Sequence, residues 1–368
     1  MKKNKLLIAI GAVIALVVLC FWLSQDQNPI ADSKVVRIGA ILPLTGPVGE
    51  DGRMALAALQ IAEEAVCSSN DIKCKFYYED GKYDAKTTIT CFNKLMVNRP
   101  DALMVLGDVP NNSLSSMIAS SKMIDLALVT CDEILIGGND WMFAGWFPFS
   151  VENEVLCKYA VENLKVKRVG ILALRNNFGD DAVRTFKNAA NQLHCTVVAT
   201  ETYDMDSPDV RSQIAKILNH TPDAVYVAGF GQGYISAFNE LLSSGYKGHL
   251  LSNTAISIDG NRMNIVNHAK GVYYVDVAFD SNATDAMSFI EAFKKKTGKL
   301  PSSTFATIYV MGKHLASVAI KARNEAVDLK ALLVNGGVEN SIIGGFAHKP
   351  NGQLMVPLKV QRVGGDNE

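Results

Sequence analysis

The sequence predicts an α/β fold of two lobes, each built on a doubly wound parallel sheet. Short apolar segments without polar alternation recur along the chain, and amphipathic segments separate them. Buried strands of this kind belong to parallel sheets that helices cover on both faces. Repeated strand–helix units of this length form right-handed crossovers. About ten strand candidates are too many for one sheet in a small domain, so we divide the chain into two lobes.

The expected strands follow in order along the chain. They are Val35–Leu42, Lys73–Glu79, Ala102–Leu106, Leu126–Thr130, Arg168–Leu174, Thr196–Thr200, Ala224–Ala228, Gly248–Leu251, Gly271–Val277 and Met355–Val363. Helices are expected over Lys86–Val97, Asn153–Leu164, Asp180–Leu193, Arg211–Leu218 and Ile235–Leu242, and over a block from Ala283 to Ala326 broken at Gly298 and Pro301. A final strand pair, Ile342–His348 and Leu354–Val363, flanks the tight turn Lys349–Gly352.

The most informative stretch is the first strand, turn and helix, Val35 to Glu64. An apolar strand ends at Leu44, and a turn with Thr45, Gly46 and Pro47 leads into a helix. The turn and the helix amino terminus present free backbone N–H groups, which form a ready site for an anionic ligand group. We therefore expect the ligand site at this edge of the sheet.

The aromatic, proline-bearing stretch Trp141–Phe149 marks the boundary between the two halves. It interrupts the strand–helix alternation, and Ser150 follows it as the expected cap of the next helix. The second lobe begins here.

Residues 1–24 read as an export segment outside the fold. The positive start Met1–Lys5 precedes an uncharged apolar run, Leu6–Leu23. Three fates are open: an uncleaved membrane anchor through residues 6–23, a cleaved signal peptide, or lipidation at Cys20. Leu19 argues against lipidation, since bacterial lipoprotein signals carry a small residue there. All three place the folded part in the periplasm or at the cell surface, after a polar linker over residues 25–34.

Six cysteines remain after Cys20, and an exported chain permits disulfides. Cys67 and Cys74 bracket a short loop and are the first candidate pair; Cys157 and Cys195 are the second. Buried free thiols are the alternative.

Composition and motifs favour neither nucleic-acid binding nor catalysis. The net charge of −1 provides no basic stripe for nucleic acid. Gly229–Gly233 has the spacing Gly-x-Gly-x-Gly, which lacks the dinucleotide fingerprint and suits a flexible cleft turn. The six histidines are scattered without metal-ligand spacing. We expect no enzyme activity, no cofactor and no metal.

Four landmarks, weak alone, are specific in their order and spacing. They are IGAILPLTGP at 38–47, Tyr77–Asp80 followed by Asp84–Lys86, Asn176–Gly179, and Asp209–Ile217 followed by Pro222–Val225. Together they resemble the periplasmic amino-acid-binding proteins of the Leu/Ile/Val type, the substrate-binding components of ABC transporters. The resemblance covers about Val35 to Val363 and implies the type I periplasmic-binding-protein fold.

The resemblance also implies a hinge of three crossings, near Phe147, Val277 and Gly345. Lobe one would then comprise residues 35–146 with 280–343, and lobe two residues 147–276 with 346–363. A ligand between the lobes favours the closed form, because only that form contacts it on both sides.

Carried over position by position, the resemblance implies ligand-binding residues in both lobes. They are Asp51, Asn111, Thr130, Asp132, Glu133, Phe178, Phe230 and Thr254.

Several of these positions depart from the family pattern. Asn111 occupies the position of the family's serine that binds the carboxylate of the amino-acid ligand, and Asp51 occupies that of an aromatic residue. Thr254 occupies the position of the glutamate that binds the ligand's ammonium group. Asp132 and Glu133 replace small residues, although this pair also suits a calcium-binding or solvated loop. The added acids in lobe one favour a cationic or amine-bearing ligand, or expel an ordinary carboxylate.

The leading hypothesis is an extracytoplasmic solute-binding protein that captures an amino acid, amide or amine for ABC-type uptake, with an importer permease as partner. The alternative is a membrane-tethered sensory or interaction module with the same fold and no transport role. A third hypothesis, a hydrolase using Asp132 and Glu133, has the least support.

Overall fold

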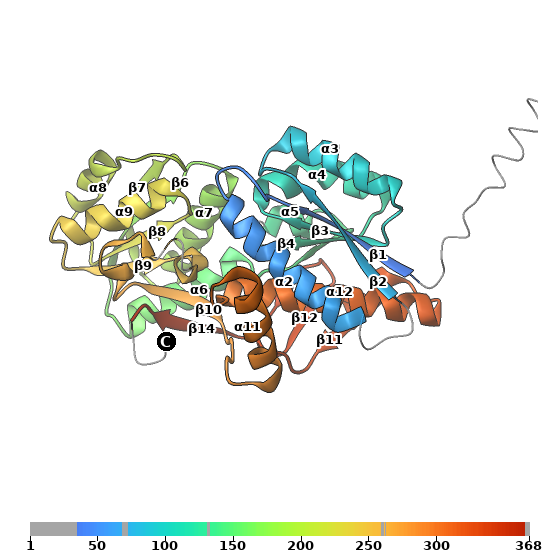
Figure 1. Ribbon diagram of the computed structural model, residues 1–368. Helices are drawn as coiled ribbons and strands as arrows, with labels where there is room; N and C mark the ends of the chain where they lie inside the picture. The colour runs from blue at the N-terminus through green and yellow to red at the C-terminus, as the bar shows by residue number, and fades with distance from the viewer. Residues whose placement is uncertain (1–34, 68–72, 131–132, 259–260, 262, 365–368) are drawn as a thin grey trace, which may run out of the picture.

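The computed structural model describes residues 35–364 except 68–72, 131–132, 259–260 and 262. Two mixed α/β lobes lie side by side, each organised around its own main sheet (Figure 1). The expected signal or anchor over residues 1–24, the linker over 25–34, and Cys20 lie outside the described residues. Within the described part, no helix is both long enough and apolar enough to cross a membrane.

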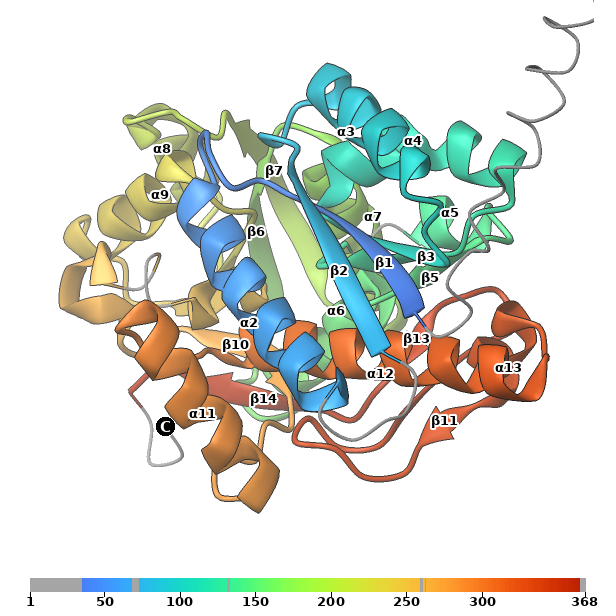
Figure 2. The same ribbon diagram turned by 45° about the vertical axis from the view of Figure 1, so that its right-hand side comes forward.

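The first sheet has five parallel strands in the order β2-β1-β3-β4-β5. Its strands are β1 (Val35–Leu42), β2 (Lys73–Asp80), β3 (Ala102–Leu106), β4 (Asp125–Leu128) and β5 (Met142–Ala144). Its helices are α2 (Gly49–Cys67), α3 (Ala85–Val97), α4 (Asp108–Ser121), α5 (Glu133–Gly137), α11 (Thr284–Thr297), α12 (Ser303–Glu325) and α13 (Leu329–Asn335). Helix α2 packs against α11 and α12 on one side of the sheet, and α3 packs against α4 on the other (Figure 2).

The second sheet has six strands in the order β14-β10-β9-β8-β6-β7. They are β6 (Arg168–Leu174), β7 (Thr196–Tyr203), β8 (Ala224–Ala228), β9 (His249–Ser252), β10 (Tyr273–Val277) and β14 (Leu358–Arg362). The helices are α6 (Phe149–Glu162), α7 (Asn177–Gln192), α8 (Arg211–Leu218) and α9 (Gln232–Ser243), with 3₁₀ turns η1 (Thr254–Ser257) and η2 (Val266–Ala269). All pairings are parallel except that β14 runs antiparallel to β10.

A small antiparallel sheet of β11 (Gly337–Val338), β12 (Phe346–His348) and β13 (Leu354–Met355) belongs with the first lobe. The His348 ring shares a 2.8 Å hydrogen bond with the carbonyl of Ala144, and Ala144 donates to Gly352 O at 2.8 Å. The chain therefore enters the second sheet only after β13, through Val356 and Pro357.

The sequence-based strands agree closely with the structure. The bounds of β1, β3, β6 and β8 are as expected, because each is an apolar run that is buried. The expected strand Met355–Val363 is divided between two sheets. Strand β5 was missed, since its three residues lie within the aromatic stretch read as an interruption. The cap expected at Ser150 is also wrong: α6 begins at Phe149, and its N-cap is Pro148.

The predicted disulfides are not formed, and the five described cysteines are free thiols. The Cys67 thiol donates to the carbonyl of Cys74 at 2.7 Å, so it points at the backbone rather than at the second sulfur. Cys157 and Cys195 do meet, but as hydrogen-bonded thiols.

In each lobe, the first strand of the main sheet and the helix that follows it approach each other closely through their backbones. The pairs are β1 with α2 and β6 with α7. A Cβ atom at Gly52 would lie 2.0 Å from the carbonyl oxygen of Pro43, and one at Gly179 would lie 1.7 Å from that of Leu174. The missing side chain thus lets the helix amino terminus lie directly against the end of the strand. This contact positions the residues of both helix starts.

We expect Gly52→Ala to lower the free energy of unfolding by about 1–3 kcal/mol, because the new methyl group must displace backbone. Urea unfolding measures the change. The control is Gly137→Ala at the end of α5, where the nearest atom to an added Cβ is 3.6 Å away. Equal effects of the two substitutions would contradict this account.

Candidate functional site

The candidate site lies where the carboxyl ends of the two sheets face each other. In the first sheet the strand order reverses between β1 and β3, and in the second between β6 and β8. Crevices at such switch points are the usual ligand sites of open α/β sheets. The loops after these strands carry Asp51, Asp108, Phe178 and Phe230, which all border one cavity.

The cavity is open to solvent on one side, and the space between its walls, open solvent included, is about 850 Å³. Side chains of both lobes line it, together with Trp146, which follows β5, and the amino end of α12. The lining residues are Pro43, Val48, Asp51, Tyr83, Leu106, Gly107, Asp108, Val129, Trp146, Glu152, Phe178, Phe230, Asn253, Thr254, Ala255, Ile258, Asn261, Thr304, Phe305 and Ile308. A concave site between two lobes that is mostly apolar, with a few polar groups, suits a small organic molecule.

The structure brings four of the eight predicted site residues to this cavity: Asp51, Phe178, Phe230 and Thr254. Their positions were predictable because each follows the carboxyl end of a strand. Whether they bind a ligand stays a prediction.

Two other predicted residues are buried away from the cavity. The amide of Asn111 donates to Val105 O at 2.9 Å and to Gly107 O at 2.6 Å, so it braces the β3–α4 turn. Thr130 is 1% exposed and does not line the cavity. Asp132 and the side chain of Glu133 lie outside the described residues.

The anion site expected in the first turn is occupied by the protein itself. Asp80 Oδ1 accepts from the N–H groups of Leu44 at 2.9 Å and Thr45 at 3.3 Å. Asp80 Oδ2 accepts from the Thr45 hydroxyl at 2.6 Å. The turn donors therefore stabilise an internal carboxylate instead of a ligand.

Several contacts between described residues join the lobes across the cleft. Asp108 of α4 accepts a short hydrogen bond from the Tyr83 hydroxyl, and Asn176 of the second lobe lies 3.5 Å from its other oxygen. The Tyr83 ring also packs edge-on against Phe230, with 6.1 Å between centroids. Ser303 of α12 donates to Asp276 of β10. The lobes are therefore in contact, and the cavity is partly closed.

Glu152, which sequence reasoning missed, is the most enclosed acid of the cavity. It lies in the first turn of α6 and is 1% exposed. Its Oε1 atom accepts from Thr254 N at 3.1 Å. The single hydroxyl hydrogen of Thr254 is shared between Val275 O, 2.8 Å from Oγ1, and Glu152 Oε1, 3.2 Å from Oγ1. The carboxylate is thus fixed at the wall of the cavity.

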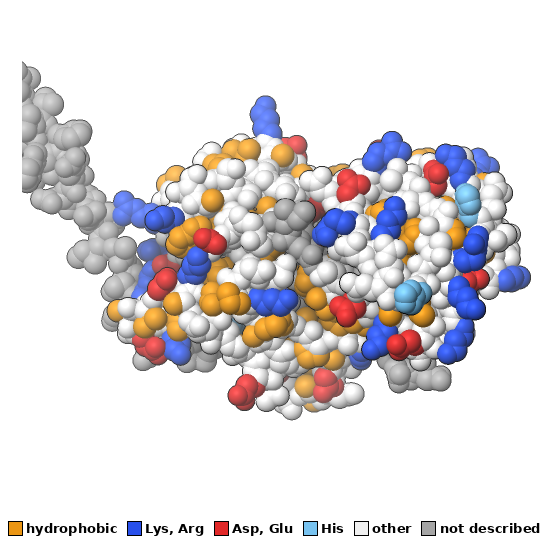
Figure 3. Space-filling view, turned by 180° about the vertical axis from the view of Figure 1, so that it is seen from behind, with side chains coloured by type: hydrophobic (Ala, Val, Ile, Leu, Met, Phe, Trp, Pro, Cys, Tyr) orange, Lys and Arg blue, Asp and Glu red, His pale blue; other side chains and the backbone are white. Residues whose placement is uncertain are grey.

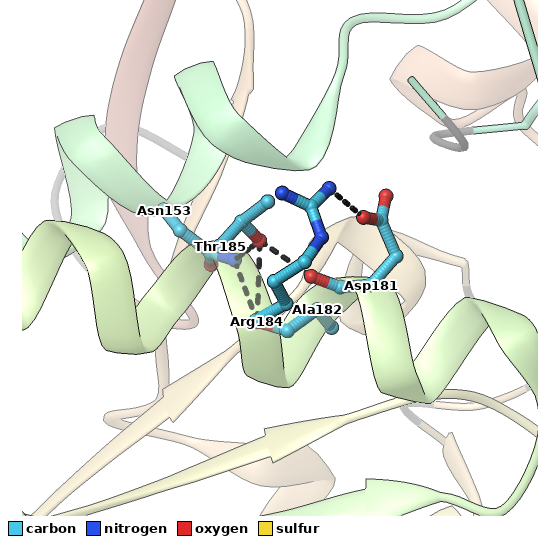
Figure 4. A network of polar contacts seen from close by, with 5 residues as sticks. All are labelled: Asn153, Asp181, Ala182, Arg184 and Thr185. Atoms are coloured by element: carbon cyan, nitrogen blue, oxygen red, sulfur yellow. Dashed lines mark hydrogen bonds and ion pairs between the residues drawn. The ribbon is translucent and has the colours of Figure 1, made fainter. Parts of the chain in front are cut away.

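Helix α6 is itself fixed to α7 (Figure 4). The amide of Asn153 donates to Thr185 Oγ1 at 2.8 Å and to Ala182 O at 3.1 Å, and both partners lie on α7. Next to these hydrogen bonds, Arg184 forms an ion pair with Asp181 one turn earlier on α7. Because Asn153 directly follows Glu152, this network restrains the position of the buried carboxylate.

Burial raises the pKa of several carboxyl groups at the cleft. Burial raises the pKa of Glu152 to about 8 in spite of the hydrogen bonds from Thr254, and the charge of Asp276 adds to the rise. Burial also raises the pKa of Asp276 to about 7. For Asp51, burial and the neighbouring Glu50 raise the pKa to about 6. Glu152 and Asp276 therefore bind protons near neutral pH.

Sequence signals for the missed residues were weak. Glu152 comes from the crossing segment, and only its contact with Thr254, 102 residues away, reveals its position. Tyr83, Trp146 and Phe305 are ordinary core-type aromatics in the sequence. Gly229–Gly233 fits the suggested cleft turn, since Phe230 within it lines the cavity.

The basic side chains lie elsewhere. Lys and Arg residues are spread over the outer surface and gather along one edge of the second lobe (Figure 3). Among the described residues, no Lys, Arg or His lines the cavity. In the same part of the chain, no cluster of three His, Cys, Asp or Glu side chains could hold a metal ion.

Comparison with known proteins agrees with this architecture. A Leu/Ile/Val-binding protein homolog of Brucella melitensis is 21% identical over 337 residues, which cover 88% of this chain and 89% of the relative. The crystal structure of a leucine-binding protein from Thermotoga maritima superimposes with a TM-score of 0.79 at 18% identity, covering 89% and 95% of the two chains. A benzoate-bound solute-binding protein of an R. palustris ABC transporter gives 0.78 at 15% identity, covering 90% and 94%.

The profile of the periplasmic binding protein family matches residues 35–368, which include both sheets and every residue that lines the cavity. The chain therefore belongs to the periplasmic binding protein family.

Proposed function

We propose that the chain is an extracytoplasmic solute-binding protein that captures a small molecule between its lobes and delivers it to an ABC-type importer. The observation that carries the proposal is the cavity at the two facing switch points, which both lobes line. The names of the relatives support the transport role, since they include Leu/Ile/Val-binding proteins and an ABC-transporter component.

Binding rather than catalysis is the role we propose for the cavity. Among its described lining residues there is no Ser, Cys, Lys or His to act as a nucleophile beside a general base. A ligand held by Asp51 on one side and by Phe178, Phe230 and Thr254 on the other would favour closure, because only the closed form contacts it from both lobes.

We propose hinge crossings near Phe147 and Val277, as the sequence suggests, and a third at Val356–Pro357. The third differs from the position expected near Gly345, because β12 and β13 pair with β11 and contact the first lobe through Ala144. The two lobes would then move about these three short segments.

We expect Phe230→Ala to weaken ligand binding by about tenfold or more, since Phe230 contacts Phe178 at 5.3 Å and Tyr83 at 6.1 Å between centroids and lines the cavity. A thermal-shift panel of amino acids, amides, amines and aromatic acids identifies the compound, and calorimetry measures its affinity. The control, Tyr246→Ala, changes a half-buried aromatic of the same lobe outside the cavity. A wild-type protein that no compound stabilises would count against uptake.

We expect the unliganded protein to lose stability as the pH rises, through Glu152. The pKa of this group is about 8 in the folded protein against an ordinary 4.5. The contribution of Glu152 to the free energy of unfolding is therefore fully present below about pH 4.5, and it is lost as the pH rises to about 8 and above. Between pH 5 and pH 8.5 the wild type should lose about 3 kcal/mol of unfolding free energy relative to Glu152→Gln.

The amide of that variant can still accept the hydrogen bonds of Thr254. Urea unfolding at several pH values measures the difference, with Glu162→Gln at the exposed end of α6 as the matched control. Parallel pH profiles of wild type and Glu152→Gln would refute the assigned protonation.

A further inference from the structure

Building on the solute-binding role, we propose that the ligand is an organic cation: an amine with an apolar body and no carboxylate, whose ammonium group binds the free oxygen of Glu152. The inference rests on four features of the cavity, namely its charges, the geometry of Glu152, the helix ends around it and its aromatic walls.

The charge-bearing side chains of the lining are all acidic. Asp51, Asp108 and Glu152 face the cavity, and none of the described lining residues is basic. The basic group whose charge acts on Asp51, Lys299, is already paired with Glu50. A ligand carboxylate would therefore meet like charge without a cationic partner, whereas an ammonium group would compensate the charge that is present.

The acids differ in how many of their carboxylate oxygens already accept hydrogen bonds from the protein. Asp108 is occupied by Tyr83 and approached by Asn176 across the cleft. Glu152 uses only Oε1, for both bonds from Thr254, and no hydrogen bond reaches its Oε2 from the described residues. A carboxylate oxygen that is fixed, almost fully enclosed and open to the cavity is a ready acceptor for an N–H donor.

The helix ends that normally attract anions are already neutralised. The first turns of α2, α4 and α6 contain Asp51, Asp108 and Glu152, respectively. Asp276 lies at the start of α12, where it accepts from Ser303. An acidic side chain of the protein therefore already lies at each of these helix ends, where a ligand anion would otherwise be favoured.

The rest of the wall suits an apolar, flat body. Tyr83, Trp146, Phe178, Phe230 and Phe305 line the cavity, with leucine, valine and isoleucine between them. Aromatic faces add cation–π attraction for an alkylammonium group, in addition to burying apolar surface.

Three matched probes test the class: 2-phenylethylamine, phenylalanine and 3-phenylpropionate, which share the ring and differ in their charged groups. Calorimetry at pH 7 should show that the amine binds at least tenfold more tightly than the amino acid, and that the acid does not bind. Glu152→Gln should weaken the amine at least tenfold, while Glu162→Gln leaves its affinity unchanged.

The number of protons released when the amine binds is a second measure of the role of Glu152. A variant that only lost side-chain packing would not change this number. Glu152 is largely protonated in the empty cavity, since its pKa is about 8, and an ammonium partner favours its ionised form. Asp276 and Tyr234 are the other titratable groups that act on it electrostatically. Heats measured in phosphate and in Tris should show a proton released on amine binding by the wild type, and less release by Glu152→Gln.

The outcomes separate this inference from the proposed function. If phenylalanine or 3-phenylpropionate binds more tightly than the amine, solute binding stands and the organic-cation assignment is overturned. If the amine binds Glu152→Gln as well as wild type, the role of Glu152 is overturned. If neither these probes nor the wider panel binds, the proposed function fails as well.

Discussion

The pair of hydrogen bonds between Glu152 and Thr254 connects the parts of the molecule that form the cavity. Thr254 follows β9 and also bonds to Val275 of β10, while Glu152 lies in the first turn of α6, the helix that follows β5. One residue thus ties two strands of the second sheet to the segment that leaves the first. Asn153 extends this connection to α7. The carboxyl group is therefore part of the framework as well as of the cavity wall, and its position is coupled to that of α6.

The aromatic shell explains how two lobes with separate sheets share one cavity. Phe178 stands at the start of α7 and packs on Phe149 of α6, with 4.8 Å between centroids. Phe230 packs on Phe178 and reaches Tyr83 of the first lobe. This row of edge-to-face contacts runs from α6 to the opposite lobe. Each such pair adds about 0.5–1.5 kcal/mol beyond area burial, so closure depends on several modest contacts rather than on one strong bond.

The sequence predicted the features that depend on local pattern and on strand ends. Apolar runs identified the strands, and the resemblance to the amino-acid-binding family, carried over to the loops that follow them, led to Asp51, Phe178 and Phe230. Features that depend on contacts between residues far apart in the chain could not be predicted from the sequence. Glu152 looks like an ordinary acid in the first turn of a helix, and its burial follows only from its contact with Thr254. The anion site expected at the first turn failed for the same reason, because Asp80 comes from the neighbouring strand.

The buried acids imply a balance between stability and binding. Desolvation disfavours the charged forms of Glu152 and Asp276, so the empty protein must either keep protons on them or lose stability when they ionise. Replacing these residues by apolar ones would remove that cost but would also remove the hydrogen bonds that they accept from Thr254 and Ser303. A bound cation supplies the missing charge inside the closed cavity, where water does not screen it. On this proposal, ligand binding, closure of the cleft and proton release are coupled. The bound cation stabilises the ionised carboxylate, which the empty cleft disfavours.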